Sequence, residues 1–190
     1  MPTAINNSLI FLINTLFDLY LFVLVVRFIL VWIHADYYHP VTQFIIKLTQ
    51  KPVLLLKKIL PNIQRIEISS LALILLLETV KYFFIIRLNF GFLSPSGLFI
   101  LASADSLKLF ASTFFYAILL QAILSWIQPY SPVAELLHQF TSPIMRPIQR
   151  WMPPIAHFDL SPIPALIGLQ LFIMLIVNPL MGMGIGLLST

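Results

Sequence analysis

Four long apolar stretches limit what this chain can fold into more than any other feature of its sequence. They cover residues 8–33, 68–90, 104–127 and 160–188. A helix needs about 20 mostly apolar residues to cross the hydrocarbon core of a bilayer, so each stretch can cross once. Runs such as LALILLL do not alternate apolar and polar residues, as the strands of a membrane barrel do. The pattern predicts an all-α membrane protein with four transmembrane helices.

The composition argues against the other broad classes. Of the 190 residues, 59% are hydrophobic and 9% are charged, against roughly 45–50% and about 25% in soluble domains. The 16 phenylalanines argue against a disordered chain, because disordered segments have few aromatic residues. The sequence has no cysteine, which excludes a disulfide, a thiolate metal site and a cysteine nucleophile.

Lysine and arginine gather in the segments that follow the first and third apolar stretches. They are Lys47, Lys51, Lys57, Lys58 and Arg65 in one segment, and Arg146 and Arg150 in the other. With four crossings these segments lie on the same side, and basic loops face the cytoplasm. We therefore expect both termini outside. The net charge of +4 is then a topology signal, and no nucleic-acid partner is expected.

The chain contains two copies of one unit, at residues 1–92 and 93–190. Trp32 and Trp126 each close an apolar stretch, and beyond them the copies keep one register. The matched pairs include Pro40 and Pro132, Thr49 and Thr141, Lys58 and Arg150, Pro61 and Pro153, Glu67 and Asp159, and Ser69 and Ser161. Since each copy crosses the membrane twice, both have the same orientation, which predicts tandem parallel helix–loop–helix repeats.

The loops inside the two copies, 34–67 and 128–159, contain many prolines yet are still apolar. In the second loop we expect a short amphipathic helix over 133–140. A second helix begins at Pro143, with Thr141 or Ser142 as its N-cap. Such helices lie in the headgroup plane, with basic side chains towards anionic phosphates. The alternatives, that they only pack beneath the bundle or that the loops are re-entrant, stay open.

The second loop also has an unusual spacing of proline and arginine. It reads TSPIMRPIQRWMPP and then FDLSP, between Thr141 and Pro162. In this motif, its length and its two repeats, the chain resembles the YggT family of small bacterial inner-membrane proteins, which has relatives in chloroplasts. In the first copy, Leu54 and Leu55 replace two motif residues. The motif positions are Trp126, Pro132, Thr141, Pro143, Arg146, Pro147, Arg150, Pro153, Asp159, Ser161 and Pro162.

The resemblance implies a multi-pass protein of the bacterial inner (plasma) membrane. The family has been linked to osmotic-stress tolerance, potassium uptake, cell division and nucleoid organisation, and its chloroplast relatives to cytochrome assembly. No catalytic activity comes with the resemblance, so we expect no enzyme, no cofactor and no bound metal. The implied partners are anionic phospholipids and other inner-membrane, division or assembly proteins, and homo-oligomerisation stays open.

Several ionisable side chains lie inside the predicted spans, where each costs about 2.5–3.5 kcal/mol to insert. Glu78 and Lys81 are three residues apart and can pair on one helix face. We therefore expect Glu78→Gln to leave Lys81 unpaired and to impair folding. Asp105 and Lys108 repeat the same spacing, which predicts a second local pair.

Asp18 and Arg27 are nine residues apart, so they point to opposite sides of one helix and need different partners. Arg27 is close enough to the cytoplasmic end to extend its guanidinium group to the interface. Gln121 holds the equivalent position in the second copy. Near the end of the chain, Gly182 and Gly186 form a GxxxG pair, which predicts close contact between helices.

These patterns leave two functions of different classes open. In the first, which we favour, a non-enzymatic organising or assembly factor docks lipid or protein through its basic, proline-rich loops. In the second, a small channel or transporter subunit conducts potassium, protons or another cation along the intramembrane polar residues. The residues that would line this path are Glu78, Lys81, Asp105 and Lys108, and Arg27 and Gln121 are the other polar residues singled out inside the spans. The competing interpretation of these residues is that neutralised pairs only fix the helix register.

Overall fold

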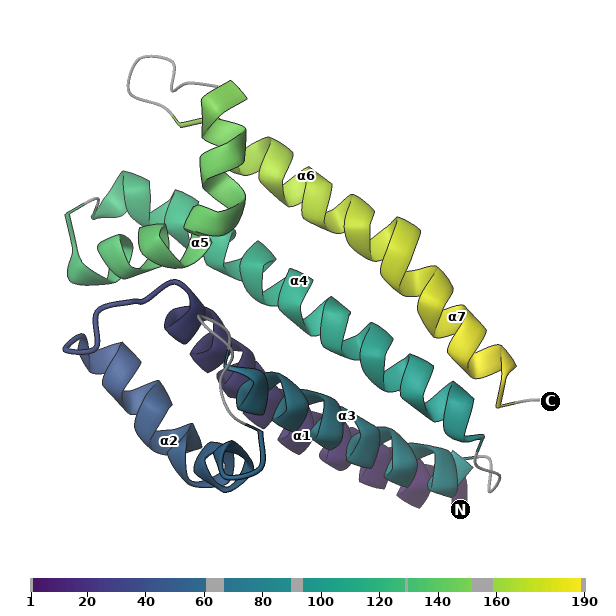
Figure 1. The fold of residues 1–190 in the computed structure, drawn as a ribbon. Helices are drawn as coiled ribbons and strands as arrows, with labels where there is room; N and C mark the ends of the chain where they lie inside the picture. The colour runs from purple at the N-terminus through teal and green to yellow at the C-terminus, as the bar shows by residue number, and fades with distance from the viewer. Residues whose placement is uncertain (1, 61–66, 90–93, 129, 152–158, 189–190) are drawn as a thin grey trace.

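Long helices make up almost all of the described structure (Figure 1). The computed structural model describes residues 2–60, 67–89, 94–128, 130–151 and 159–188. Within these ranges the elements are α1 (Pro2–Trp32), α2 (Pro40–Lys57), α3 (Ile68–Asn89), α4 (Pro95–Ile127), α5 (Pro132–Trp151), α6 (Pro162–Phe172), the π-helical segment η1 (Ile173–Val177) and α7 (Asn178–Gly186). The last three follow one another without a break. The predicted all-α class is confirmed for these residues.

Among the described residues, three helices are long and apolar enough to cross a membrane. They are Ala4–Trp32, Pro95–Ile127 and Pro162–Gly186, which correspond to the first, third and fourth apolar stretches. The second stretch is also helical, as the 22 residues of α3, but α3 is not one of these three candidate spans. Length and composition thus support three of the four expected crossings directly.

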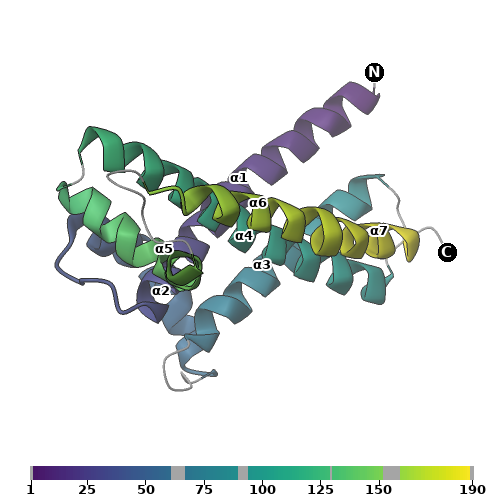
Figure 2. The same cartoon turned by 90° about the horizontal axis from the view of Figure 1, so that it is seen from above.

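The long helices pack side by side and join the two copies, and α1 also contacts α4 directly. α1 packs on α3, α3 on α4, and α4 on α6 and α7. The shorter helix α2 contacts α1 and α3, and α5 contacts α4 and α6. Seen along two directions, α2 and α5 lie at the end of the molecule opposite both termini (Figures 1 and 2). Each copy therefore has the same order: a long helix, a shorter helix at this end, and a returning helix.

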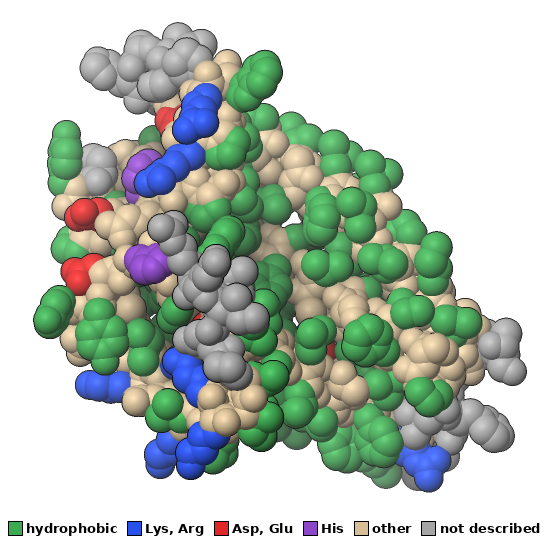
Figure 3. Space-filling view, viewed as in Figure 1, with side chains coloured by type: hydrophobic (Ala, Val, Ile, Leu, Met, Phe, Trp, Pro, Cys, Tyr) green, Lys and Arg blue, Asp and Glu red, His purple; other side chains and the backbone are tan. Residues whose placement is uncertain are grey.

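The buried core lies between α1, α3 and α4 and so belongs to both copies. Its main members are Leu21, Leu24, Val25 and Ile29 of α1, Leu73 and Ile74 of α3, and Phe114 and Ala117 of α4. Many other apolar side chains stay on the surface, where Figure 3 shows them over α4, α6 and α7. Exposed apolar surface of this extent is typical of a protein that a bilayer covers.

The described part of each loop segment folds into one helix, α2 or α5, which corrects the prediction of two short helices in the second loop. Pro143 and Pro147 lie inside α5, and Pro52 lies inside α2. Thr141 does not cap a separate helix, because it lies inside α5, with its hydroxyl oxygen 3.0 Å from the carbonyl oxygen of Leu137 one turn earlier. A proline inside a helix removes one hydrogen bond and kinks the helix without necessarily ending it. Figure 1 shows the resulting sharp turn along α5.

Close contact between α4 and α7 depends on a glycine that the GxxxG pattern did not single out. A Cβ at Gly182 or Gly186 would meet nothing within 4 Å, so within the described chain these two glycines are not where α7 approaches another helix. A Cβ at Gly184 would lie 2.7 Å from Leu101 Cγ and 3.2 Å from the Leu101 backbone nitrogen. The GxxxG pattern correctly indicated a helix rich in small residues, but the glycine that faces α4 is Gly184.

We expect Gly184→Ala to destabilise the folded protein by about 1–3 kcal/mol, the usual cost of overpacking. The added methyl group would overlap Leu101, whose backbone cannot move without shifting α4. Gly182→Ala is the matched control, because it adds the same methyl group in open space. Thermal unfolding in detergent measures both variants. Equal melting temperatures for the two would contradict the assigned contact.

Candidate functional site

The first copy buries a network of charged side chains, the first node, formed by Arg27, Thr49, Lys57, Glu67 and Ser70. Arg27 Nε and Nη2 donate to the two carboxylate oxygens of Glu67 at 3.0 and 3.1 Å. Arg27 Nη1 donates to Thr49 Oγ1 at 3.0 Å. Arg27 is only 4% exposed, so the expectation that it extends to the interface is wrong. The bidentate pair with Glu67 holds it inside instead.

Two further groups complete the first node around the Glu67 carboxylate. Lys57 Nζ lies 2.6 Å from Oε1, and the Ser70 hydroxyl donates to Oε2 at 2.5 Å. Burial acts to raise the pKa of Glu67, but the hydrogen bonds from Arg27, Lys57 and Ser70 outweigh it and lower the pKa to about 2. The node therefore ties α1, α2 and the start of α3 together through one ionised carboxylate.

The second copy has its own polar side chains near the matching positions, here called the second node, and they form two separate groups: Gln121 with Thr141, and Gln149 with Asp159 and Ser161. Thr141 Oγ1 donates to Gln121 Oε1, as Thr49 contacts Arg27 in the first copy. Gln149 Nε2 donates to Asp159 Oδ2 at 3.1 Å. The matching contact in the first copy is that of Lys57 with Glu67. Two contacts of the first node are thus repeated in the second copy. The central contact is not, because Gln121 makes no hydrogen bond to Asp159 within the described residues, and the two cationic side chains of the first node are neutral amides in the second.

The second node also includes the residues at the entry of the last helix. Ser161 directly precedes α6, and Pro162 is the first residue of that helix. However, the Ser161 side chain makes no capping bond and donates instead to Asp159 Oδ1. The backbone N–H of Ser161 donates to the same oxygen at 2.9 Å. A carboxylate is a stronger acceptor than a hydroxyl, so Asp159 satisfies this helix entry.

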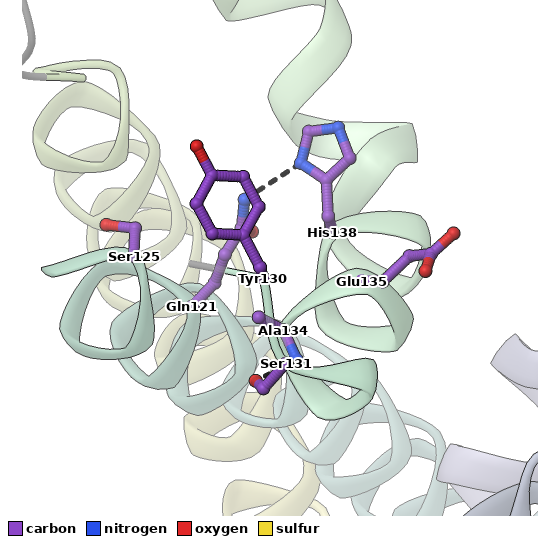
Figure 4. Close-up of a pocket in the computed structure, with 7 residues that line it drawn as sticks. All are labelled: Gln121, Ser125, Tyr130, Ser131, Ala134, Glu135 and His138. Atoms are coloured by element: carbon purple, nitrogen blue, oxygen red, sulfur yellow. Dashed lines mark hydrogen bonds between the residues drawn. The ribbon is translucent and has the colours of Figure 1, made fainter. Parts of the chain in front are cut away.

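An open pocket of about 400 Å³ lies beside the second node. Figure 4 shows Gln121 and Ser125 of α4 on one side of it and His138 of α5 on the other, with the Tyr130 ring between them in this view and the Glu135 carboxylate pointing away from them. The Gln121 amide nitrogen lies 3.2 Å from His138 Nδ1. Gln121 therefore joins Thr141 and His138 on α5, which fits a role in packing α5 onto α4.

A second group of charges, the charge cluster, joins the middle parts of α1, α3 and α4 and shares no residue with either node. Lys81 Nζ is 2.9 Å from Asp18 Oδ1, 2.6 Å from Glu78 Oε2 and 2.6 Å from Asp105 Oδ2. The predicted Glu78–Lys81 pair is present. Asp18 and Arg27 have different partners, as their separation along α1 predicted. One ammonium group thus connects α1, α3 and α4.

The predicted local pair between Asp105 and Lys108 is wrong. Asp105 contacts Lys81 on α3 instead. Lys108 is exposed and makes no ion pair within the described residues. It lines a cavity of about 140 Å³ together with Asp18, Glu78 and Asp105. The spacing of Asp105 and Lys108 places both on one face of α4, but Lys81 on the neighbouring helix α3 is the cation that Asp105 contacts.

The remaining motif residues lie on the surface at the basic end of the molecule. Trp126, Pro132, Arg146, Pro147 and Arg150 are exposed. Pro143 is partly buried, and Pro153 lies outside the described residues. Over the described ranges, no group of three His, Cys, Asp or Glu side chains has an arrangement that could hold a metal ion.

Sequence reasoning did not find the pairing of Arg27 with Glu67, or the part that Lys57 and Gln149 play in the two nodes. The repeat alignment contained a signal for both. Glu67 and Asp159 are matched residues, and Arg27 and Gln121 are matched polar residues within apolar helices. Arg27 and Glu67 are polar positions that both copies keep, so a contact between them in the first copy could have been predicted.

These features define the class of protein. The described chain is all helical, has three apolar helices of spanning length, buries its charges only in pairs or clusters, and carries basic side chains at one end. It is a multi-pass helical membrane protein. The family model described as CCB3/YggT matches residues 6–88 and 100–180, in two segments consistent with two repeats. The chain belongs to the CCB3/YggT family.

Similar proteins occur in several bacteria. One of Pseudomonas aeruginosa is 35% identical over 186 residues, covering 95% of this chain and 93% of the relative. One of Vibrio alginolyticus is 38% identical over 167 residues, covering 86% and 90%. The protein YggT of Escherichia coli K12 is 33% identical over 159 residues, covering 82% of each chain. All three are described as uncharacterized, and no solved structure matches this chain.

We expect Glu67→Gln to destabilise the protein by about 3–5 kcal/mol, because it leaves Arg27 buried without its counter-charge. Asp159→Asn is the matched control, since the carboxylate in the second node contacts only uncharged groups among the described residues. Its cost should be closer to that of a weakened hydrogen bond, about 1 kcal/mol. Melting temperatures in detergent test the order, and an equal loss in both variants would contradict it.

Acidification should weaken the wild-type protein through the same carboxylate. The pKa of Glu67 is lowered from 4.5 to about 2 in the folded protein, so ionised Glu67 stabilises the fold at neutral pH. This contribution is lost as the pH falls from about 4.5 towards 2. Melting temperatures measured between pH 7 and pH 3 should therefore fall more steeply for the wild type than for Glu67→Gln. Parallel curves would argue against the lowered pKa.

The charge cluster changes the expectation for Glu78→Gln. Lys81 keeps Asp18 and Asp105 as partners, so this variant should cost only about 1 kcal/mol. Lys81→Gln should cost more, about 3–5 kcal/mol, because it leaves three carboxylates together without a cation. Folded yield and melting temperature in detergent distinguish the two. A larger loss in Glu78→Gln would overturn this ranking.

Proposed function

We propose that this protein is a non-enzymatic organising or assembly factor of the bacterial inner membrane, and that α2 and α5 are its docking platform on the cytoplasmic leaflet. The observation that carries this proposal is the outward face of α2. Figure 3 places the lysines and arginines of the visible face mainly over α2 and α5. The basic end of the molecule is also the end opposite both termini.

The outward face of α2 has two adjacent stripes. Phe44, Leu48 and Leu55 form an apolar stripe and are 64%, 49% and 66% exposed. Lys47 and Lys51 are exposed on the neighbouring stripe. The inward face buries Thr42, Ile45, Thr49 and Val53 against the bundle. A helix that is apolar on its outer side as well is suited to the membrane interface, where lysines extend to the phosphates.

α5 offers a different kind of surface. Its apolar residues, including Leu136 and Phe140, are buried, and its exposed residues include Arg146 and Arg150. Trp151, at its end, is 88% exposed. Arginine and tryptophan are the residues that most often anchor protein–protein contacts. We infer that α2 rests on the lipid surface and that the end of α5, with Arg150 and Trp151, is the part that contacts a protein partner.

This proposal includes a topology of four crossings, by α1, α3, α4 and the rod formed by α6, η1 and α7. α3 is the fourth crossing because it packs along α1 and α4 and returns the chain from α2 to the opposite end. The basic end faces the cytoplasm under the positive-inside rule, and both termini face outward. The two copies are then parallel repeats.

The alternative function, conduction of a cation, is supported by the cavity of about 140 Å³ among Asp18, Glu78, Asp105 and Lys108. However, the Lys81 ammonium group lies within 2.9 Å of all three carboxylates. It occupies the position that a passing cation would need. The cluster therefore supports a structural role better than a conduction path.

Single cysteines test the proposed placement of α2, because the chain has no native cysteine. Phe44→Cys and Leu55→Cys, labelled with a nitroxide in vesicles, should be accessible to membrane-dissolved oxygen and protected from a water-soluble nickel chelate. Gln50→Cys is the matched control, since Gln50 is exposed on the same helix away from the apolar stripe, and it should show the reverse.

Two outcomes would contradict the proposed function. If all three labels prefer the water-soluble reagent, α2 does not lie on lipid. If the protein conducts potassium or protons into liposomes, and Asp105→Asn abolishes the flux while the protein stays folded, the conducting function replaces the organising one.

A further inference from the structure

A groove of about 520 Å³ lies at the basic end, at the junction of the two copies. One wall comes from the end of α1 in the first copy, with Trp32, Ile33 and His34. The other wall comes from α5 in the second copy, with Gln139, Ser142 and Arg146. Neither copy alone would form this groove, and it is separate from the two nodes and the charge cluster.

The polar groups of the groove are donors without partners. Arg146 is exposed and makes no ion pair or hydrogen bond with any described residue. The hydroxyl of Ser142 has no hydrogen bond within the described chain either, although Ser142 is only 9% exposed. Its neighbour Thr141, by contrast, bonds to the preceding turn. Gln139 and His34 add an amide and an imidazole N–H.

The lining of the groove contains no acidic residue among those that the structure describes. A guanidinium group, a hydroxyl, an amide and an imidazole that face one space match the oxygens of a phosphate group. Lysine-rich surfaces attract anions generally, but here the donors converge from two separate segments of the fold.

The apolar wall indicates the source of the phosphate. Trp32 is the last residue of α1, one of the three helices long and apolar enough to cross a membrane, and it is 39% exposed. Tryptophan at the end of such a helix lies at the headgroup level. A phosphate bound beside Trp32 and Ile33 would therefore have its glycerol and first methylene groups against apolar side chains.

We propose that this groove binds the headgroup phosphate of an anionic phospholipid, one lipid for each chain. The inference rests on the proposed function, which places this end at the cytoplasmic leaflet. Arg146 contacts the phosphate as a bidentate donor, and Ser142, Gln139 and His34 complete its shell. The bound lipid joins the two copies at the membrane surface and fixes the angle of α5.

The first copy shows why only one such site is expected. At the positions that match Arg146, Ser142 and Gln139 it has Leu54, Gln50 and Lys47. The arginine that would clamp the phosphate is thus replaced by an apolar side chain, which lies on the exposed surface of α2. The two copies share their nodes but not this groove.

Trp32 provides a reporter inside the groove once Trp126→Phe and Trp151→Phe remove the other two tryptophans. This variant is reconstituted in phosphatidylcholine vesicles that contain a small fraction of phosphatidylglycerol brominated near the glycerol. Selective binding predicts stronger quenching of Trp32 by brominated phosphatidylglycerol than by the same fraction of brominated phosphatidylcholine. Arg146→Gln should weaken the apparent affinity by about tenfold or more, as expected for a lost charged hydrogen bond.

Arg150→Gln is the matched control, because it removes the same charge from an exposed position on the same helix that does not line the groove. It should leave the apparent affinity within about twofold. An equal loss in both variants would show general surface attraction and overturn the site. Equal quenching by the two brominated lipids would also overturn it. Full reversal by millimolar inorganic phosphate would assign the groove to a free anion instead of a lipid.

Neither glutamine variant should unfold the protein, since Arg146 has no partner in the described structure. Melting temperatures of Arg146→Gln and Arg150→Gln test whether both variants stay folded. The result is also distinct from the test of α2. Nitroxide labels can place Phe44 and Leu55 in lipid while Trp32 shows no selectivity. In that case the lipid site fails and the proposed function stands.

Discussion

The ammonium group of Lys81 sets the level at which three helices meet. Its carboxylate partners come from α1, α3 and α4, and a charge in apolar surroundings is costly unless it is paired. The first node follows the same rule, since Arg27 is buried together with Glu67. Apolar surfaces require only that helices touch, whereas these ion pairs require one rotation and one register. The arrangement of the bundle therefore depends on a few buried charges.

The two copies show how one scaffold can be held by different chemistry. In the first node, two cations surround Glu67. In the second, Gln149 and Ser161 bind Asp159 through uncharged groups. The contacts between long helix, shorter helix and returning helix are kept in both. The difference at the surface is larger, because the second copy has Arg146 where the first has a leucine.

Much of the fold could be predicted from hydropathy and residue spacing, because a helix and its apolar face are set by residues that are close together in the sequence. The apolar helices and the amphipathic character of α2 and α5 are examples. The interruption predicted near Pro143 was wrong, since packing against α4 and α6 holds α5 together as one bent helix. The pair predicted between Asp105 and Lys108 was wrong for a related reason. Sequence spacing showed that the two share a helix face, but Lys81 on another helix was the available cation.

The sequence by itself determined the helical membrane class, the two repeats and the basic loops, since hydropathy, register and charge are properties of local segments. Only the tertiary structure decided that Arg27 meets Glu67 forty positions away, that Gly184 lies against α4, and that Trp32 and Arg146 border one groove. Each of these contacts depends on how a helix is rotated against its neighbours. That rotation follows from the sum of many contacts between distant segments, and no single stretch of sequence contains it.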